Sequence, residues 1–257
     1  MAVPASSRAR PSSAETSSKS SVIPELSFGV LTKVPEKQDA MRLVTDSIAQ
    51  QRQIASFSVI VHPACLVGLV AGCTSVWRLN ADRDFGTALM MVCGLILAYL
   101  AAVRLLTANY IRLAESMRWT EWIASPHGED DYILAARFGE EIIATLVLRL
   151  LPPADSSQKT RSSSLKGGSA IIRAWTTKQR YRGKGVGGDM LRLAILTTRS
   201  RCGGDAQISF DTAHANSARP LHDMFNRPFN KREKKARAAL EHALAACDRG
   251  DSTFEIQ

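Results

Sequence analysis

One stretch of the chain decides its fold: Arg180-Tyr181-Arg182-Gly183-Lys184-Gly185-Val186-Gly187-Gly188. Before it, residues 169–177 have the apolar pattern of a strand, and after it apolar residues recur at helical spacing. The glycines therefore lie at a strand-to-helix junction. A helix N-terminus presents unpaired N–H groups and a partial positive charge, and residues without side chains let phosphate oxygens approach closely. The stretch predicts a backbone cradle for a diphosphate, to which Arg180, Arg182 and Lys184 add positive charge.

Two other phosphate-binding patterns fit these residues less well. A P-loop requires Gly-Lys followed by Ser or Thr, which this stretch lacks. The spacing Gly183-x-Gly185-x-x-Gly188 satisfies the dinucleotide fingerprint, and Asp211 ends the next apolar run, where a ribose-binding acid would stand. However, polar or bulky residues separate the strand from the first glycine. Too little chain follows Asp211 to build the further strand-helix units of a dinucleotide domain.

A third pattern, Gln/Arg-x-x-Gly-x-Gly/Ala, fits as Arg180-x-x-Gly183-x-Gly185. In this motif the chain resembles the acyl-CoA pyrophosphate loop of the GNAT superfamily of N-acetyltransferases. The resemblance implies that acetyl-CoA is the cosubstrate, with its pantetheine arm along a splayed fourth strand and its diphosphate at the glycine loop. The residues that the resemblance assigns to acetyl-CoA binding are Ala174, Trp175, Thr176, Thr177, Arg180, Tyr181, Arg182, Gly183, Lys184, Gly185, Val186, Gly187 and Asn216.

The neighbouring segments follow the order that this family's fold requires. The resemblance implies an α+β fold, in which a mixed central sheet is flanked by helices and interrupted by an inserted two-helix transmembrane hairpin. Gly139 is expected to form the turn between the second and third strands. Strands are expected at residues 28–31, 132–136, 141–151, 169–177 and 207–211, and helices at 35–51, 185–199 and 218–221.

Two apolar runs, residues 54–77 and 85–106, are each long enough to cross a hydrocarbon core at about 1.5 Å rise per residue. Because a short polar turn separates them, both flanks would emerge on one side of a membrane. Basic residues favour the flanks over the turn, which predicts an integral membrane protein with two spans and a cytosolic catalytic domain. This arrangement resembles camello-like membrane N-acetyltransferases, and the endoplasmic reticulum is the favoured membrane. The alternative is that both runs are buried helices of a soluble bundle.

These features divide the chain into five segments. We expect a disordered Ser-rich tail at residues 1–26, the first strand and helix at 27–53, the membrane hairpin at 54–107, the GNAT core at 108–230, and a basic helix and tail at 231–257. The basic helix is either solvated and packed on the sheet or in contact with anionic headgroups. The net charge of +9 is spread over several segments rather than one face, so nucleic-acid binding is not favoured. The five cysteines show no paired spacing for zinc, and no metal site is expected.

The resemblance also implies the reaction. A neutral amine attacks the acetyl carbonyl directly, backbone N–H groups polarise that carbonyl, and an acid protonates the departing thiolate. His222, with Asp223 beside it, stands where the family usually has a catalytic Tyr, and Asp211 or His214 could relay a proton. Equally, His222 could be a surface residue and Asp211 a loop cap. Two functions therefore stay open: a membrane-anchored N-acetyltransferase that acts on an amine of a protein or small molecule, and a catalytically weak module that binds acyl-CoA or a partner.

Overall fold

The computed structural model describes residues 24–82, 84–125, 130–153 and 165–250. Most of the predicted tail 1–26 and the end of segment 231–257 lie outside these described residues. The strands form one sheet in the order β1-β2-β3-β4-β5, in which β5 runs parallel to β4 and the other neighbours are antiparallel. The predicted mixed sheet is therefore confirmed. Its strands are β1 (Leu26–Val30), β2 (Tyr132–Phe138), β3 (Glu141–Leu151), β4 (Ser169–Thr177) and β5 (Ile208–Phe210).

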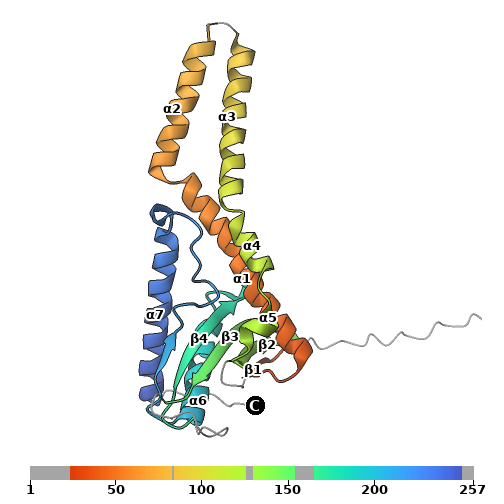
Figure 1. Cartoon of the computed structure of the whole chain (residues 1–257), viewed down its shortest axis with the longest axis vertical. Helices are drawn as coiled ribbons and strands as arrows, with labels where there is room; N and C mark the ends of the chain where they lie inside the picture. The colour runs from red at the N-terminus through yellow and green to blue at the C-terminus, as the bar shows by residue number, and fades with distance from the viewer. Residues whose placement is uncertain (1–23, 83, 126–129, 154–164, 251–257) are drawn as a thin grey trace, which may run out of the picture.

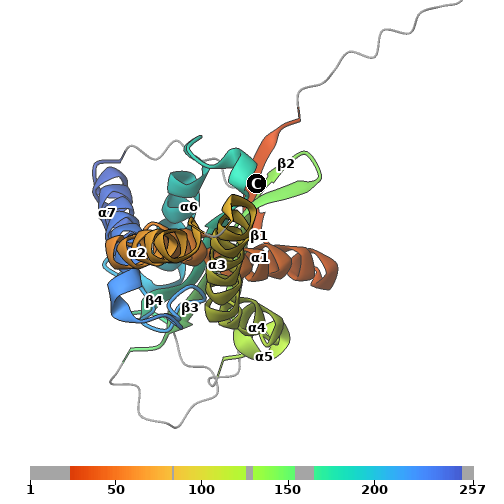
Figure 2. The same cartoon turned by 90° about the horizontal axis from the view of Figure 1, so that it is seen from above.

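Helices cover the sheet and also extend far beyond it. In Figure 1, α2 and α3 rise together from the body of the molecule, and α7 runs along one side of that body. Figure 2 looks down on this pair and shows α2 and α3 above the sheet and its other helices. The helical segments are α1 (Val34–Ile60), α2 (Pro63–Asn80), α3 (Phe85–Leu106), α4 (Asn109–Glu115), α5 (Trp119–Ile123), α6 (Val186–Cys202) and α7 (Arg227–Asp248), with short 3-10 turns η1 (Gln179–Tyr181) and η2 (Asp223–Phe225).

The apolar side chains of β2 pack on both faces of the sheet. Leu134 and Ala136 belong to a buried cluster formed with α6 and α7. Ile133 and Ala135 belong to a second cluster, formed with α1 and α5. Because successive side chains of a strand point to opposite faces, one continuous apolar run can pack against helices on both sides. Gly139 makes the turn into β3 with φ 61°, as predicted.

The sheet opens beyond the point where β4 and β5 pair. β5 pairs with β4 at Ala170–Ile172, and a register shift against β3 then leaves Arg173 outside the regular ladder. In the part of the chain that the structure describes, no strand continues along residues 174–177 on the β5 side. Backbone groups on this edge of β4 are therefore open to a ligand, which is the splay expected of the fourth strand.

The first apolar run is not one helix, which corrects the predicted limits of the hairpin. Residues 54–60 continue α1, and Ala55 and Val59 are buried in a core cluster that also includes residues of α4 and α7. After a short break α2 begins at Pro63, bent by 58° from α1. A proline lacks the N–H of a helical hydrogen bond and disfavours the helical conformation in the residue before it. His62 is accordingly extended, with φ −66° and ψ 129°.

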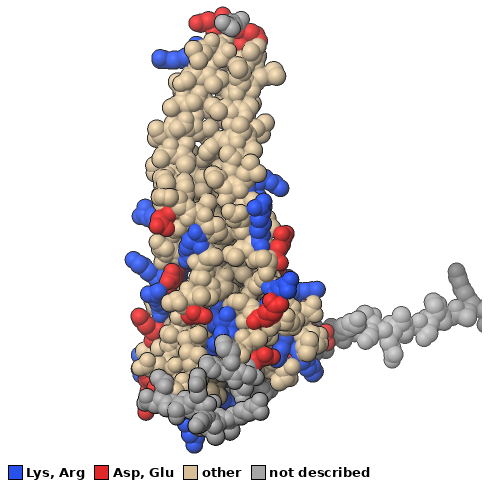
Figure 3. Space-filling view, in the orientation of Figure 1, with Lys and Arg blue, Asp and Glu red and all other residues tan. Residues whose placement is uncertain are grey.

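The pair α2 and α3 stands apart from the core. Among the described residues, none of α2 is buried, and in α3 only Ala88 and Val103 are. Gly72 allows the two helices to approach closely, since a Cβ there would lie 3.1 Å from Leu95 Cδ2. Figure 3 shows charged side chains on the body and at the far tip, with uncharged surface between them. By length and apolarity, Phe85–Glu115 is able to span a membrane, whereas α2 meets that criterion only together with α1 across their bend.

The helix predicted at residues 218–221 is not present in the described structure. Residues 211–222 run without a helix from β5 to η2, and the helix that follows is α7. Pro220 accounts for the difference, because it disfavours the helical conformation in the preceding residue and offers no N–H. The predicted basic helix begins earlier than expected, at Arg227, and packs against α6.

Candidate active site

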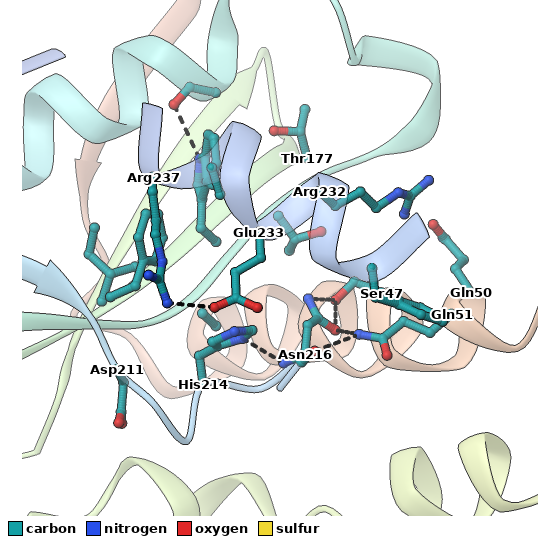
Figure 4. Close-up of a pocket in the computed structure, with 18 of the residues that line it drawn as sticks. Ser47, Gln50, Gln51, Thr177, Asp211, His214, Asn216, Arg232, Glu233 and Arg237 are labelled. Atoms are coloured by element: carbon teal, nitrogen blue, oxygen red, sulfur yellow. Dashed lines mark hydrogen bonds and ion pairs between the residues drawn. The ribbon is translucent and has the colours of Figure 1, made fainter. Parts of the chain in front are cut away.

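A cavity of about 580 Å³ lies beside the open edge of β4. Its walls include residues of α1, which covers one face of the sheet, and residues of α7 and the start of α6, which cover the other. The cavity therefore reaches from one face to the other where β4 and β5 diverge. Figure 4 shows polar side chains of α1 and α7 converging there, with α1 behind and α7 in front.

Most residues predicted to bind acetyl-CoA line this cavity. Arg180, Lys184 and Gly185 in the adjoining loop and Val186 at the start of α6 lie outside the lining itself. The predicted acetyl-CoA residues that do line the cavity are Ala174, Trp175, Thr176, Thr177, Tyr181, Arg182, Gly183, Gly187 and Asn216. Asp211, predicted to be catalytic, also lines it.

Two glycines give the loop its shape. Gly183 has φ 77°, and Gly185, the N-cap of α6, has φ 87°. Residues with a Cβ adopt this left-handed region at a cost of about 1–2 kcal/mol, which explains why glycine stands at both positions. A Cβ at either glycine would meet no described heavy atom within 4 Å, so the space beside the loop is open. The first N–H groups of α6, beginning at Val186, lack intrahelical partners, and the loop is therefore suited to an anion.

Trp175 fixes the start of α6 against β4. Its Nε1 donates a hydrogen bond to the Gly187 carbonyl oxygen at 3.2 Å. A Cβ at Gly187 would lie only 3.1 Å from Trp175 Cζ2, so a side chain there would push the helix away from the strand. This contact holds the helix N-terminus next to the open edge of β4.

Arg182 and Arg232 place positive charge at the loop end of the cavity. Arg182 Nε donates to the Thr177 carbonyl oxygen, and its Nη2 donates to Gln50 Oε1, both at 2.9 Å. Burial lowers the pKa of Arg182, and the nearby charge of Arg232 lowers it further. Within the described residues, neither guanidinium forms an ion pair with a carboxylate. Two neighbouring cations without an acidic partner favour the binding of an anionic ligand.

Asn216 is held by polar residues of α1. Gln51 Nε2 donates to Asn216 Oδ1 at 2.6 Å, and Asn216 Nδ2 donates to Ser47 Oγ at 3.3 Å. Arg219 Nη1 donates to the backbone oxygen of Asn216 at 2.6 Å. Ser47 and Gln51 are buried, so their hydrogen bonds fix the α1 wall of the cavity to the segment that follows β5.

His214 and Glu233 lie next to each other in the cavity (Figure 4). His214 Nδ1 accepts a hydrogen bond from the Asn216 N–H at 3.2 Å, so the proton of the neutral ring lies on Nε2. Burial lowers the pKa of His214, and the charge of Arg219 lowers it further. Glu233 Oε1 accepts from Arg237 Nη2 at 2.7 Å, and Glu233 Oε2 lies 3.7 Å from Arg219 Nη2. His214 is therefore a hydrogen-bond donor through Nε2, and the Glu233 carboxylate beside it is a hydrogen-bond acceptor.

The two predicted catalytic residues, Asp211 and His222, are not part of the group formed by His214 and Glu233. Asp211 Oδ1 accepts from the Ala213 N–H at 2.9 Å, and Asp211 Oδ2 lies 3.5 Å from Arg173 Nε. In Figure 4 its carboxylate points away from His214 and Glu233. His222 is exposed before η2, where its Nδ1 accepts from the Met224 N–H at 3.4 Å, and it does not line the cavity. Asp211 therefore lines the cavity but caps its own loop. His222, the predicted acid, lies outside the cavity.

Sequence reasoning missed the contributions of α1 and α7. The side chains within each set are three or four residues apart or adjacent, so they share a helix face. A run of charged residues on a helix is, however, also typical of a face exposed to solvent. Only the packing of α7 on α6 shows that this face of α7 lines a cavity instead. The missed lining residues of these helices are Ser47, Gln50, Gln51, Phe229, Arg232, Glu233, Ala236 and Arg237.

Three comparisons relate the chain to known proteins. The Acetyltransferase (GNAT) family matches residues 100–227. Among solved structures, a transcriptional regulator from Bacillus halodurans C-125 is 18% identical, with 50% of this chain and 67% of that chain covered and a TM-score of 0.28. An integron cassette protein from the mobile metagenome of V. cholerae is 14% identical, with 82% and 83% covered and a TM-score of 0.33. These TM-scores are too low to carry an argument about the fold. No curated protein matches the chain.

The family match extends from the end of α3 to the start of α7. It includes β2 to β5, the glycine loop and the whole of α6. Among these, β4, β5, the loop and the start of α6 contribute residues to the cavity lining. Residues 100–227 of this chain are therefore an acetyltransferase domain of the GNAT family.

Proposed function

We propose that this protein is a membrane-anchored N-acetyltransferase, which transfers the acetyl group of acetyl-CoA to a primary amine. The observation that carries the proposal is the cavity beside β4. It has a glycine loop and arginines on the α6 and α7 side, and polar side chains on the α1 side. Two substrates can therefore meet at the open edge of β4 from opposite faces of the sheet.

The loop side fits the CoA portion of acetyl-CoA. The open space beside Gly183 and Gly185 and the N–H groups at the start of α6 suit a diphosphate. Arg182 and Arg232 supply positive charge that no described carboxylate neutralises. Backbone groups at residues 174–177 are free of a strand partner on this edge, so they can bind the amide-rich arm and polarise the thioester carbonyl.

The reaction needs a group that takes a proton from the amine. In the proposed step, a neutral amine attacks the acetyl carbonyl carbon, a C–N bond forms, and the C–S bond breaks. The amine proton passes to the Glu233 carboxylate, and the CoA thiolate takes a proton from solvent. His214, neutral and donating through Nε2, orients an acceptor oxygen rather than acting as the base.

The pair α2 and α3 is the proposed membrane anchor. Its outward side chains include Val67, Leu79, Met90, Leu97 and Leu105, each more than three-fifths exposed. A soluble domain would bury such surface, whereas a hydrocarbon core makes its exposure favourable. Basic residues of the flanks would hold the catalytic domain on the cytosolic side, where acetyl-CoA is available.

Acetyl-CoA binding by the detergent-purified full chain tests the proposal. We expect saturable binding in calorimetry and release of the CoA thiol when an amine is added. Gly185→Trp should abolish binding, because Trp is strained at positive φ and fills the space beside the loop. Gly188→Ala is the matched control, since it lies within α6, has open space around it and should bind normally.

The outcomes separate the two functions that the sequence leaves open. Binding with transfer to an amine supports the enzyme. Binding without transfer to any amine would favour a module that holds acyl-CoA. Failure of the folded wild-type protein to bind acetyl-CoA would show that the proposed function is wrong.

A further inference from the structure

A second groove leads from the cavity toward the apolar hairpin. Its volume is about 810 Å³, and it lies between α1 on one side and α3 and α4 on the other. Gln50 lines both this groove and the cavity, so the two spaces meet at that residue. On α1 the groove residues recur three or four positions apart, from Asp46 through Gln53 to Ile60, and so form one stripe along the helix.

The two ends of the groove differ in chemistry. The end near the hairpin is apolar and is lined by Ile60, Leu100 and Ala101. The end near the cavity is polar, with Asp46 and Gln50. The groove therefore has the polarity gradient of an amphiphile whose tail lies in a membrane and whose head lies at the protein surface.

Two arginines lie between these ends. Arg52 Nη2 donates to the backbone oxygen of Arg104 at 3.5 Å, which brings the two residues together on facing helices. In the described part of the chain, neither guanidinium pairs with a carboxylate, and the Asp46 carboxylate forms no ion pair either. The middle of the groove thus presents two cations beside α3, and its polar end presents one anion closer to the cavity.

We propose that this groove binds a membrane phospholipid whose headgroup carries a primary amine, and that this amine is the acetyl acceptor. This inference rests on the proposed N-acetyltransferase function and on the insertion of α2 and α3 into a membrane. The acyl chain lies against Ile60, Leu100 and Ala101, and the phosphate binds Arg52 and Arg104. The ammonium group is attracted by Asp46 and enters the cavity past Gln50.

The dimensions suit a phosphoethanolamine headgroup. At 1.5 Å rise per residue, Arg52 and Asp46 lie about 9 Å apart along the axis of α1. The long side chain of Arg52 can cover part of this distance, and a phosphate and an amine joined by two carbons can bridge the rest toward Asp46. Arginine is also the residue best suited to bidentate contact with phosphate oxygens.

The reaction balances without a further reactant. The headgroup ammonium first loses one proton, and the resulting amine attacks the acetyl carbonyl carbon. The C–S bond breaks as the C–N bond forms, the second amine proton passes to Glu233, and the CoA thiolate takes a proton from solvent. Glu233 then returns its proton to solvent. The products are an N-acetylated phospholipid, CoA with a free thiol, and one released proton.

The test uses the full chain in nanodiscs of phosphatidylcholine with and without phosphatidylethanolamine, supplied with acetyl-CoA labelled in its acetyl group. We expect a labelled lipid amide, identified by mass spectrometry, only when phosphatidylethanolamine is present. The double variant Arg52→Gln/Arg104→Gln should lower its formation at least about tenfold, because two charge-assisted contacts to the phosphate are lost. Its affinity for acetyl-CoA should be unchanged. Arg112→Gln, an exposed arginine outside the groove, is the control for lost charge.

A second pair of variants tests the apolar end. Ala101→Trp should fill the groove and reduce lipid acetylation, whereas Ala102→Trp, its exposed neighbour outside the lining, should not. Acetylation of a water-soluble amine without any lipid amide would overturn the inference and leave the proposed function intact. Equal lipid acetylation by the wild type and the Arg52→Gln/Arg104→Gln variant would overturn the groove assignment. If acetyl-CoA does not bind at all, both the inference and the proposed function fail.

Discussion

At the scale of single residues, the environment of each titratable group decides its chemistry. His214 has the residue type of a general base, but its Nδ1 is occupied by the Asn216 N–H and burial lowers its pKa. Glu233 lies beside it with two arginines near its carboxylate. The occupied Nδ1 is the reason why the proposed reaction assigns the proton-accepting role to the Glu233 carboxylate and not to the imidazole.

Glu233→Gln tests this assignment. We expect kcat for amine acetylation to fall about 100-fold, the lower end of the range for loss of a general base. Affinity for acetyl-CoA should be kept or raised, because the cavity becomes more positive. Glu241→Gln, on the exposed surface of the same helix, is the control and should leave kcat unchanged. An unchanged kcat in Glu233→Gln would exclude Glu233 as the base.

The lowered pKa of His214 also predicts a pH dependence of stability. Above the ordinary value of 6.5, His214 is neutral in both the folded and the unfolded chain, and no linkage term arises. Below 6.5 the unfolded chain takes up a proton that the folded chain resists, so the folded state loses stability until the pH falls through the lower folded pKa. His214→Gln lacks this term. The difference in free energy of unfolding between wild type and variant should therefore shrink between pH 7.5 and pH 5.5, and a constant difference would contradict the assignment.

At the scale of elements, buried charge holds the strands in register around the open edge. The Asp131 side chain is fully buried before β2, and it accepts hydrogen bonds from Arg149 Nε of β3 at 2.6 Å and from Arg173 Nη1 of β4 at 2.7 Å. Arg173 also donates to the Trp122 carbonyl oxygen and stacks over the Trp122 ring at 4.0 Å. Since Arg173 is the residue displaced from the β3–β4 ladder, this network stabilises the point where the sheet opens.

Asp131→Asn should destabilise the fold strongly. The variant leaves two largely buried guanidinium groups with a neutral partner, and breaking a buried ion pair in this way costs about 3–5 kcal/mol. Thermal unfolding in detergent measures the loss. Asp39→Asn removes an acid from the exposed pair with Arg42 and should change stability by less than about 1 kcal/mol. Equal stability of the two variants would show that the network contributes little.

At the scale of the whole molecule, α1 joins the catalytic domain to the apolar hairpin. Its first part covers the sheet, its middle lines the cavity, and its end meets α2 at the break before Pro63. The aromatic contact between His62 and Phe225, with ring centroids 5.0 Å apart, fastens that break to the segment that leads into α7. The cavity is therefore fixed close to the base of the hairpin.

The proposed topology can be tested at the tip of the hairpin. In a background whose native cysteines are replaced by alanine, Asp82→Cys should react with a membrane-impermeant maleimide only after sealed microsomes are opened. Glu241→Cys, on the catalytic domain, should react without opening. Reaction at both positions in sealed microsomes would contradict a hairpin that crosses the membrane.

Local patterns in the sequence alone predict several strands, the glycine loop and one helix of this protein. Alternating and continuous apolar runs indicated β2, β3 and β4, and the glycine stretch 183–188 indicated the strand-to-helix junction that the structure has between β4 and α6. Helical spacing identified α6. Apolar periodicity does not register the breaks at Pro63 and Pro220, which divide the first apolar run and prevent the helix expected at 218–221.

Only the tertiary structure decided which side chains share the cavity. Ser47 and Glu233 come from opposite ends of the chain, and no local pattern brings α1 and α7 to the same edge of β4. The chemistry of His214 likewise depends on its burial and on Arg219. His222 lies outside the cavity, in the segment that runs without a helix from β5 to η2. Sequence periodicity specifies the face that a residue occupies on its own element, whereas distance between elements is set by the packing of the whole core.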